Sequence, residues 1–393
     1  MTTLDRQQTG VGLLSPAELY AELLAGQPMF ILDVRNEVEY ARNQIRGRSA
    51  LPTLNIPYFE FIEDEAIAIA RVPTGVPITV ICTKEGSSQY VAGLLAEHGF
   101  LVRYLVGGFQ AWLDFYAIHE VVSADWGKIV QLSRPARGDL SYVIISAGEA
   151  AVIDPSRHIH LYQEMTAAAQ VEISRVLLTH LAAGRLSGGA ALAHARHTLL
   201  YCHPYDALHP RTLMPAHLEY LPLLGGERLP VGQLLIEAHW FPGHTPGHLI
   251  YRVITPEGRR FLLTGDALLL RGCGRTDLGG HPETWTELLL NSLRSLSNLA
   301  DDQTLILPSS MSSLAEARSD GIVAEPFASL RTSHPALQAD TVAVLLDFVA
   351  APDEPLPALV DSFWRANLGL WQPDPTKSNE LETVPSLCIL AHQ

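Results

Sequence analysis

Two histidines and a carboxylate, each next to an apolar run, are the residues with the most evident chemistry. His180 follows the run 176–178, His244 lies in Gly-His-Thr-Pro-Gly-His at 243–248, and Asp266 ends Thr-Gly-Asp at 264–266. Two imidazoles and one carboxylate are the ligand set of non-haem Fe(II) oxygenases, which leave positions open for substrate and dioxygen. We therefore predict one Fe(II) per chain at these three residues. The alternative is that they only satisfy buried hydrogen bonds.

Cys82 is a second reactive group, between an expected strand and an expected helix. In that position backbone N–H groups and a helix N-terminus stabilise a thiolate and can hold an added anionic sulfur. The alternative is a buried structural cysteine. If Cys82 is the nucleophile, its active loop consists of Thr83, Lys84, Glu85, Gly86 and Ser87.

The surrounding pattern changes near residue 120. Helix and strand alternate over residues 14–118: Ser15-Pro16 begins a helix, 29–34 and 78–82 are short apolar strands, and 88–97 is helical. Beyond residue 125 we expect paired strands at 140–145 and 150–153, a strand at 176–178 and a long helix at 283–299. These elements predict an α/β domain, then two packed sheets with outer helices.

Composition limits the partners. The 393 residues are 47% hydrophobic and 18% charged, with a formal net charge of −15, which argues against nucleic acid and anionic membranes. The four cysteines show no paired spacing, and we find neither a secretory signal nor an apolar run of membrane-spanning length. We expect a cytoplasmic protein with small-molecule substrates. Its oligomeric state, including a homo-oligomer, stays open.

The first segment resembles the rhodanese (sulfurtransferase) family. The resemblance rests on Leu-Asp-Val-Arg at 32–35, Cys82 opening the active loop, and Leu-Val-Gly-Gly-Phe-Gln-Ala-Trp at 105–112. It implies that Cys82 accepts a sulfane sulfur as a persulfide and passes it to a thiol or cyanide. Ser87 departs from the family, many members of which carry arginine there.

The second segment, 125–393, resembles the metallo-β-lactamase fold with a C-terminal helical extension. The fold's His-x-His-x-Asp-His signature is reduced here to His180, and its last histidine is replaced, so four ligands or helpers are missing, at Ala182, Gly184, Arg185 and Ser310. A two-metal hydrolase needs those groups. The remaining triad, and Arg-Gly-Cys-Gly-Arg-Thr-Asp at 271–277, resemble the persulfide dioxygenases of this fold. That resemblance implies Fe(II) on His180, His244 and Asp266, and a glutathione-type substrate held by Arg275.

Together these features predict an α/β rhodanese-like domain followed by an αββα metallo-β-lactamase-like sandwich. The predicted function is Fe(II)-dependent oxidation of a low-molecular-weight thiol persulfide to sulfite, coupled to sulfane-sulfur transfer through Cys82. The partners would be persulfide or thiol, thiosulfate or sulfite, and dioxygen. The alternative is an active rhodanese whose second domain is catalytically impaired and binds persulfide or a partner protein. A glyoxalase-like thioester hydrolase is a more distant possibility, because it needs the missing second metal.

Overall fold

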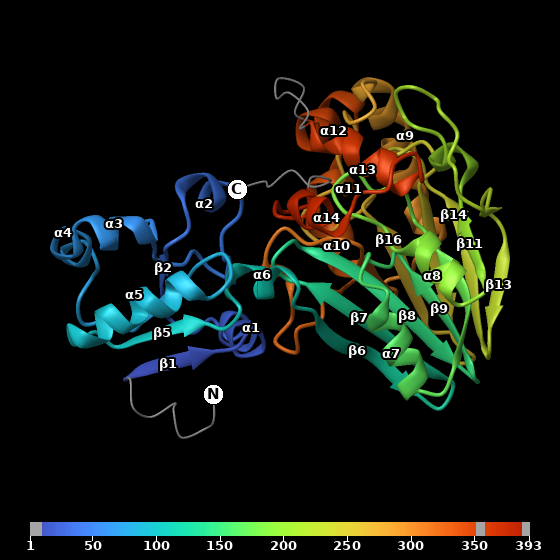
Figure 1. Ribbon diagram of the computed structural model, residues 1–393. Helices are drawn as coiled ribbons and strands as arrows, with labels where there is room; N and C mark the ends of the chain where they lie inside the picture. The colour runs from blue at the N-terminus through green and yellow to red at the C-terminus, as the bar shows by residue number, and fades with distance from the viewer. Residues whose placement is uncertain (1–9, 351–357, 387–393) are drawn as a thin grey trace.

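The first part of the chain is a parallel sheet with short helices around it (Figure 1). The computed structural model describes residues 10–350 and 358–386. Within them, the first sheet has the order β1-β5-β4-β2-β3 and every pairing is parallel. In chain order its strands are β1 (Val11–Leu14), β2 (Phe30–Asp33), β3 (Thr53–Asn55), β4 (Ile78–Ile81) and β5 (Val102–Leu105).

Helices connect these strands. The Ser15 side chain accepts from the Glu18 backbone N–H, and the Ser15 backbone N–H donates to the Glu18 carboxylate, a capping box that confirms the predicted start of α1. The helix predicted at 88–97 begins two residues earlier, so Gly86 and Ser87 lie in its first turn rather than in a free loop. The helices are α1 (Pro16–Leu24), α2 (Glu37–Arg42), α3 (Tyr58–Glu63), α4 (Glu65–Ala70), α5 (Gly86–Glu97) and α6 (Gly108–Leu113).

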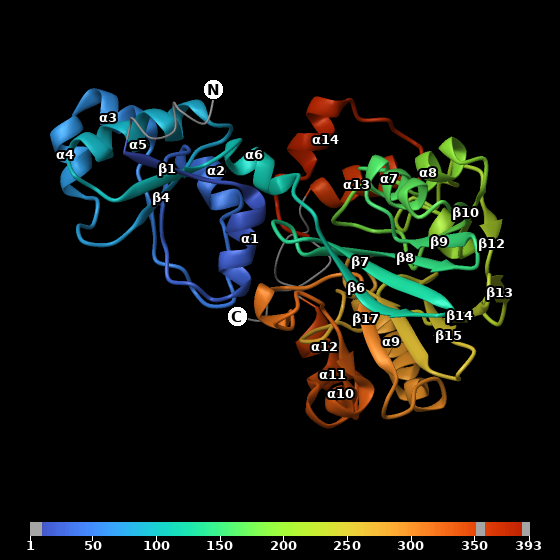
Figure 2. The same ribbon diagram turned by 90° about the horizontal axis from the view of Figure 1, so that it is seen from below.

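Two further sheets pack face to face in the second part of the chain (Figure 2). One has the order β12-β11-β10-β9-β8-β7-β6 and the other the order β13-β14-β15-β16-β17-β18. The first consists of β6 (Ala117–Ala124), β7 (Gly127–Arg134), β8 (Asp139–Ser146), β9 (Glu149–Ile153), β10 (Glu172–Leu177), β11 (Leu199–Cys202) and β12 (Leu221–Pro222). The second consists of β13 (Arg228–Val231), β14 (Leu234–Trp240), β15 (Leu249–Ile254), β16 (Arg260–Gly265), β17 (Leu305–Pro308) and β18 (Glu325–Pro326).

Helices cover the outer faces of both sheets, which gives the predicted αββα layering: α7 and α8 lie on one side and α9 on the other (Figure 2). Burial of eight consecutive residues in β8 shows that both faces of this strand are covered. The helices are α7 (His160–Ala168), α8 (Gly189–Ala195), η2 (Pro204–Ala207), α9 (Pro282–Ser295), η3 (Leu296–Asn298), η4 (Leu314–Glu316), α10 (Phe327–Ser333), α11 (Pro335–Gln338), α12 (Val342–Val349), α13 (Leu359–Asn367) and α14 (Pro375–Leu381).

One hydrophobic cluster extends across both parts, and the first sheet has a second cluster of its own. Buried Leu19 and Trp112 of the first part belong to the same hydrophobic cluster as Ile129 and Tyr142 of the second. Polar contacts reinforce the junction, including an amide hydrogen bond of 3.0 Å from Asn43 Nδ2 to the carbonyl of Ala136. Among the described residues, none of the helices has the length and apolar character that crossing a bilayer needs.

Candidate functional site

Cys82 lies directly after β4, at the carboxyl end of the parallel sheet. Its side chain is buried, and Sγ donates to Ser88 Oγ at 3.1 Å. Gly108 lets the backbone approach this loop: its φ is +63°, and a Cβ there would lie 2.2 Å from the carbonyl oxygen of Lys84. Packing against the cysteine loop therefore explains the second glycine of the Gly-Gly pair.

A pocket of about 320 Å³ opens beside Cys82. Its charged lining residues are Arg35, Glu39, Lys84 and Glu85. Arg35 is neutralised by Asp33, since its Nη2 lies 2.6 Å from Asp33 Oδ2, and both side chains are buried. The predicted active-loop residues, Thr83 to Ser87, all line this pocket.

His180, His244 and Asp266 converge in the second part, although three different loops carry them. His180 follows β10, His244 lies between β14 and β15, and Asp266 follows β16. One ligand atom from each residue lies within 4.8 Å of the others, and all three side chains are buried. His180 Nε2 is 3.4 Å from Asp266 Oδ2. The sequence reasoning selected these residues, and the fold brings them together.

Neighbouring groups orient the two imidazoles. His244 Nδ1 donates to the carbonyl of Arg275 at 2.8 Å, which turns Nε2 toward the other two residues as an acceptor. Thr179 Oγ1 donates to Asp154 Oδ2 at 2.6 Å, so it accepts from His180 Nδ1 at 2.8 Å. In each imidazole Nδ1 thus carries the proton, and Nε2 is the nitrogen that can bind a metal ion.

Unsatisfied polar atoms test whether a metal ion fits this site. Among the described residues, His244 Nε2 and Asp266 Oδ1 are buried without a hydrogen-bond partner. Buried polar atoms of this kind are costly unless a ligand or ion satisfies them. Two imidazoles and a carboxylate are suitable donors for Fe(II). The residues present therefore fit a single bound metal ion.

Charge at the site favours the deprotonated carboxylate. Burial alone would raise the pKa of Asp266, but the His180 and His244 imidazoles and the Arg185 guanidinium outweigh it and hold the pKa below its usual range. Burial is the main reason that the pKa of His248 lies well below its usual value, and His180 and His244 lower it further. The site thus favours the anionic form of the Asp266 carboxylate.

Asp206, which the sequence analysis did not select, ties two of the ligand loops together. Its carboxylate accepts from the Leu181 backbone N–H at 2.7 Å, from Thr245 Oγ1 at 2.7 Å and from the Gly247 N–H at 2.8 Å. Thus one side chain fixes the residue after His180 and the residue after His244. No local sequence signal distinguishes this aspartate from a surface residue in a Pro-Tyr-Asp turn.

Arg185 occupies the altered end of the first motif. Its Nη1 donates to the carbonyl of Ser309 at 2.7 Å, and its Nη2 lies 3.4 Å from Asp154 Oδ2. The guanidinium is buried beside the triad and adds a fixed positive charge there. Arg185 thus places a buried positive charge at a position where the fold's signature has a metal ligand. That charge would repel a second metal ion.

Arg275 has a defined structural position. Its guanidinium is buried and forms two hydrogen bonds with Asp277, of 2.9 Å from Nε and 2.6 Å from Nη2. Its carbonyl orients His244, as described above. Nearby, a Cβ at Gly274 would lie 2.4 Å from His244 Nδ1, which explains the glycine in Gly-Cys-Gly. Substrate binding by Arg275 stays a prediction.

Helix α13 covers the loops around the triad. Asn367 accepts from the Ser187 N–H at 2.8 Å and donates to the carbonyls of Ala182 and Arg185, both at 2.9 Å. Trp364 packs in one apolar cluster with Leu181, Ala183 and Leu278. The described residues around His180 line a cavity of about 20 Å³. The triad is therefore enclosed in this conformation.

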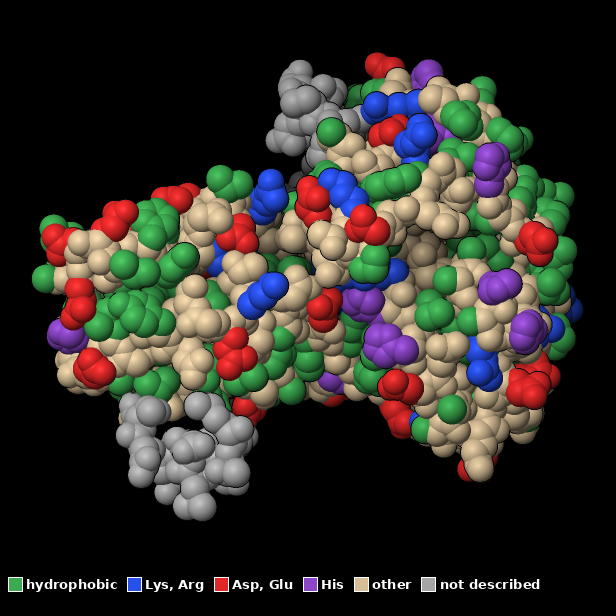
Figure 3. Space-filling view, in the orientation of Figure 1, with side chains coloured by type: hydrophobic (Ala, Val, Ile, Leu, Met, Phe, Trp, Pro, Cys, Tyr) green, Lys and Arg blue, Asp and Glu red, His purple; other side chains and the backbone are tan. Residues whose placement is uncertain are grey.

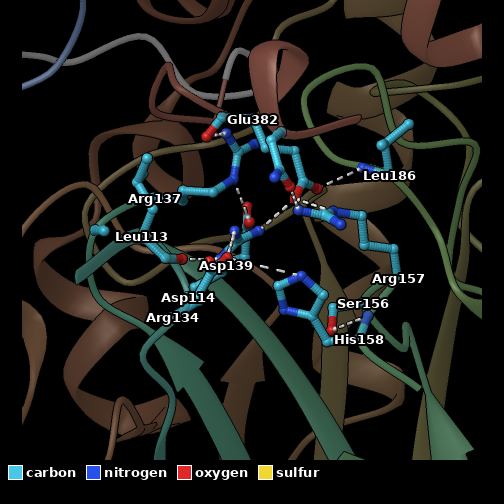
Figure 4. Close-up of polar contacts among 12 residues, drawn as sticks. Leu113, Asp114, Arg134, Arg137, Asp139, Ser156, Arg157, His158, Leu186 and Glu382 are labelled. Atoms are coloured by element: carbon cyan, nitrogen blue, oxygen red, sulfur yellow. Dashed lines mark hydrogen bonds and ion pairs between the residues drawn. The ribbon is translucent and has the colours of Figure 1, made fainter. Parts of the chain in front are cut away.

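Glu382 binds the end of the same C-terminal segment to residues of the two-sheet domain (Figure 4). Its carboxylate lies 2.6 Å from Arg134 Nη1 and 2.8 Å from Arg157 Nε, and it accepts from the Leu186 N–H at 3.1 Å. Arg137 Nη1 donates to the Glu382 carbonyl at 2.9 Å. The segment beyond α13 is thus bound to the sandwich by buried ionic contacts.

Comparisons with known proteins agree with both parts of this description. Residues 15–115 match the rhodanese-like domain, and residues 135–310 match the metallo-beta-lactamase superfamily. Two solved structures with a similar fold are a metallo-beta-lactamase from Staphylococcus aureus (TM-score 0.53, 22% identity, 63% of this chain and 74% of that one) and ETHE1 from Myxococcus xanthus (TM-score 0.50, 23% identity, 61% of this chain and 97% of that one).

Curated relatives have two different activities. Hydroxyacylglutathione hydrolase from Anaeromyxobacter dehalogenans is 32% identical over 163 residues, 42% of this chain and 59% of that protein. The human mitochondrial persulfide dioxygenase ETHE1 is 29% identical over 154 residues, 37% of this chain and 55% of that protein. The matches thus span less than two thirds of these relatives. The chain joins a rhodanese-like domain to a domain of the metallo-β-lactamase superfamily.

Proposed function

We propose that this protein oxidises a low-molecular-weight thiol persulfide to sulfite in its second domain and transfers sulfane sulfur through Cys82 in its first. The observation that carries the proposal is the buried triad of His180, His244 and Asp266, whose ligand atoms lie within 4.8 Å of one another. The residues that would bind a second metal ion are missing from the sequence. The similarity to a persulfide dioxygenase supports it.

The proposed oxidation consumes one persulfide, one dioxygen and one water, and yields one thiol, one sulfite and two protons. The terminal sulfane sulfur is oxidised while dioxygen is reduced by four electrons. Bound Fe(II) would supply open coordination positions and the redox chemistry for this step. The protein's residues orient the imidazoles through Arg275 and Thr179 and exclude bulk water with α13.

The hydrolase relative makes thioester hydrolysis the competing enzyme activity. Two observations oppose a two-metal form of that reaction here: Ala182 and Gly184 have no ligand atoms in their side chains, and Arg185 places a cation beside the triad. A binding role without catalysis is the other alternative, and the missing ligand-type side chains at Ala182 and Gly184 favour it, because the loss of groups around a metal site lowers activity. In that case the first domain alone would be catalytic.

Oxygen uptake tests the proposal. The anaerobically iron-loaded protein would receive glutathione persulfide, and oxygen consumption and sulfite would be measured together with iron content. Uptake that matches sulfite formation, and is absent in His244→Ala but retained in His194→Ala, is the expected result. His194 is an exposed histidine of α8 and serves as the matched control. Stoichiometric iron without uptake would contradict the dioxygenase function.

A further inference from the structure

Exposed apolar side chains surround the mouth of the Cys82 pocket. Tyr58 and Phe59 line the pocket and are 43% and 41% exposed. Ile62 follows Tyr58 by one helical turn on α3, so these two side chains share one face of the helix. Ile62 is 61% exposed, and Val38 of α2, next to the pocket-lining Glu39, is 62% exposed. Figure 3 shows hydrophobic side chains grouped over α3, α4 and α5.

Acidic side chains accompany this apolar group. Glu63 follows Phe59 by one turn of α3, and Asp64 and Glu65 continue the exposed run into α4, where Glu65 Oε1 lies 3.6 Å from His98 Nε2 at the C-terminal end of α5. Glu37 is exposed on α2. We define the docking face as these eight residues: Val38, Tyr58, Phe59, Ile62, Glu37, Glu63, Asp64 and Glu65.

Two of the four basic residues near the docking face are neutralised by a carboxylate. Arg71 forms an ion pair with Glu60, and Arg35 inside the pocket is paired with Asp33. The other two basic residues in this region are Arg42, at the end of α2, and Lys84, in the cysteine loop. The surface around the nucleophile thus combines exposed apolar area with negative charge. That negative charge favours a basic sulfur donor over a small dianion such as thiosulfate.

We propose that Cys82 receives sulfane sulfur from a protein that presents a cysteine persulfide on a basic, partly apolar surface. Exposed aromatic and aliphatic side chains next to a functional pocket are typical of protein interaction sites. The negative charge of the docking face complements a basic partner and would accelerate their association. This inference rests on the proposed sulfur-transfer function of Cys82.

The transfer balances without an added oxidant. The Cys82 thiolate attacks the terminal sulfur of the partner's persulfide, one S–S bond breaks and another forms, and the partner's thiolate leaves. The sulfane sulfur keeps its oxidation state throughout. Transfer from Cys82 to a small thiol would then regenerate the enzyme and supply the persulfide that the second domain is proposed to oxidise.

Two synthetic peptides test this proposal on the full chain. Each carries one cysteine persulfide next to a leucine, flanked by lysines in one peptide and by glutamates in the other. The rate of sulfur loading onto Cys82 would be followed by trapping with cyanide as thiocyanate. We expect kcat/KM to be at least about tenfold higher for the basic peptide at low ionic strength, with the difference falling at high salt.

Variants locate the effect on the docking face. The double change Glu63→Gln and Glu65→Gln should lower the preference for the basic peptide several-fold, whereas Glu283→Gln with Glu287→Gln on α9 should leave it unchanged. Ile62→Ser should raise KM for the basic peptide while leaving the rate with glutathione persulfide unaltered, which also shows that the variant is folded.

The outcomes separate the two proposals. Equal rates for the basic and acidic peptides, or no effect of the Glu63 and Glu65 changes, with loading intact would overturn the docking proposal alone. Loading of Cys82 by no donor at all would overturn the sulfur-transfer function on which that proposal rests.

Discussion

Replacing Glu382 by glutamine should loosen the C-terminal segment that encloses the triad. The Glu382 side chain is 1% exposed and contacts Arg134, itself 1% exposed, at 2.6 Å. Glutamine has almost the same shape, but it lacks the charge, and its amide would place a donor against another donor. Removing one partner of a buried ion pair costs about 3 to 5 kcal/mol. We expect Glu382→Gln to cost the lower value, about 3 kcal/mol of the free energy that holds the segment in place. The glutamine keeps one acceptor oxygen, and Arg134 Nη2 also lies 3.5 Å from Asp114 Oδ1.

Hydrogen exchange of the backbone amides of α14 and of Leu186 measures this local effect without assuming two-state unfolding of the whole chain. A loss of about 3 kcal/mol corresponds to roughly a hundredfold faster exchange at these amides. Glu380→Gln is the matched control, because Glu380 is exposed on the same helix and pairs only with Lys377 among the described residues. Exchange that rises less than about threefold in Glu382→Gln would refute the reasoning.

The same contact has a defined pH dependence. Burial alone would raise the pKa of Glu382, but Arg134, Arg137 and Arg157 outweigh it and lower the pKa well below the ordinary 4.5. A lowered pKa in the folded state means that the carboxylate stabilises the segment fully above about pH 4.5 and loses this contribution as the pH falls. The difference in exchange between wild type and Glu382→Gln should therefore shrink below about pH 4.

Three further predictions concern the reactive groups. Cys82→Ser should abolish thiosulfate:cyanide and persulfide transfer while oxygen uptake is kept; retained transfer would exclude Cys82 as the nucleophile. His244→Ala should weaken iron binding by at least about tenfold, so that elemental analysis after anaerobic loading finds less iron per chain. An unchanged iron content would remove His244 from the ligand set. The triple change Ala182→His, Gly184→Asp and Arg185→His should raise metal content above one ion per chain; a content that stays at one would show that these positions do not limit the second site.

Local pattern was enough to predict the elements that carry the chemistry. The structure contains the Ser-Pro start of α1, the apolar strands β2 and β4, and the predicted pair of strands β8 and β9, since capping and side-chain periodicity act over a few residues. The triad could be selected for the same reason. Residue type limits which side chains can bind a metal ion, and each of the three candidates lies next to an apolar run.

Tertiary structure decided how that chemistry is held and enclosed. Asp206 lies 25 positions from Leu181 and 39 from Thr245, and Arg134 contacts Glu382 across 248 positions. Neither arrangement leaves a periodic trace in the sequence, because hydrogen bonds between distant residues depend on where whole loops pack. The sequence by itself therefore determined the donor groups, namely a thiol, two imidazoles and a carboxylate. Only the folded chain determined that a cation lies beside the triad and that a C-terminal helix covers it.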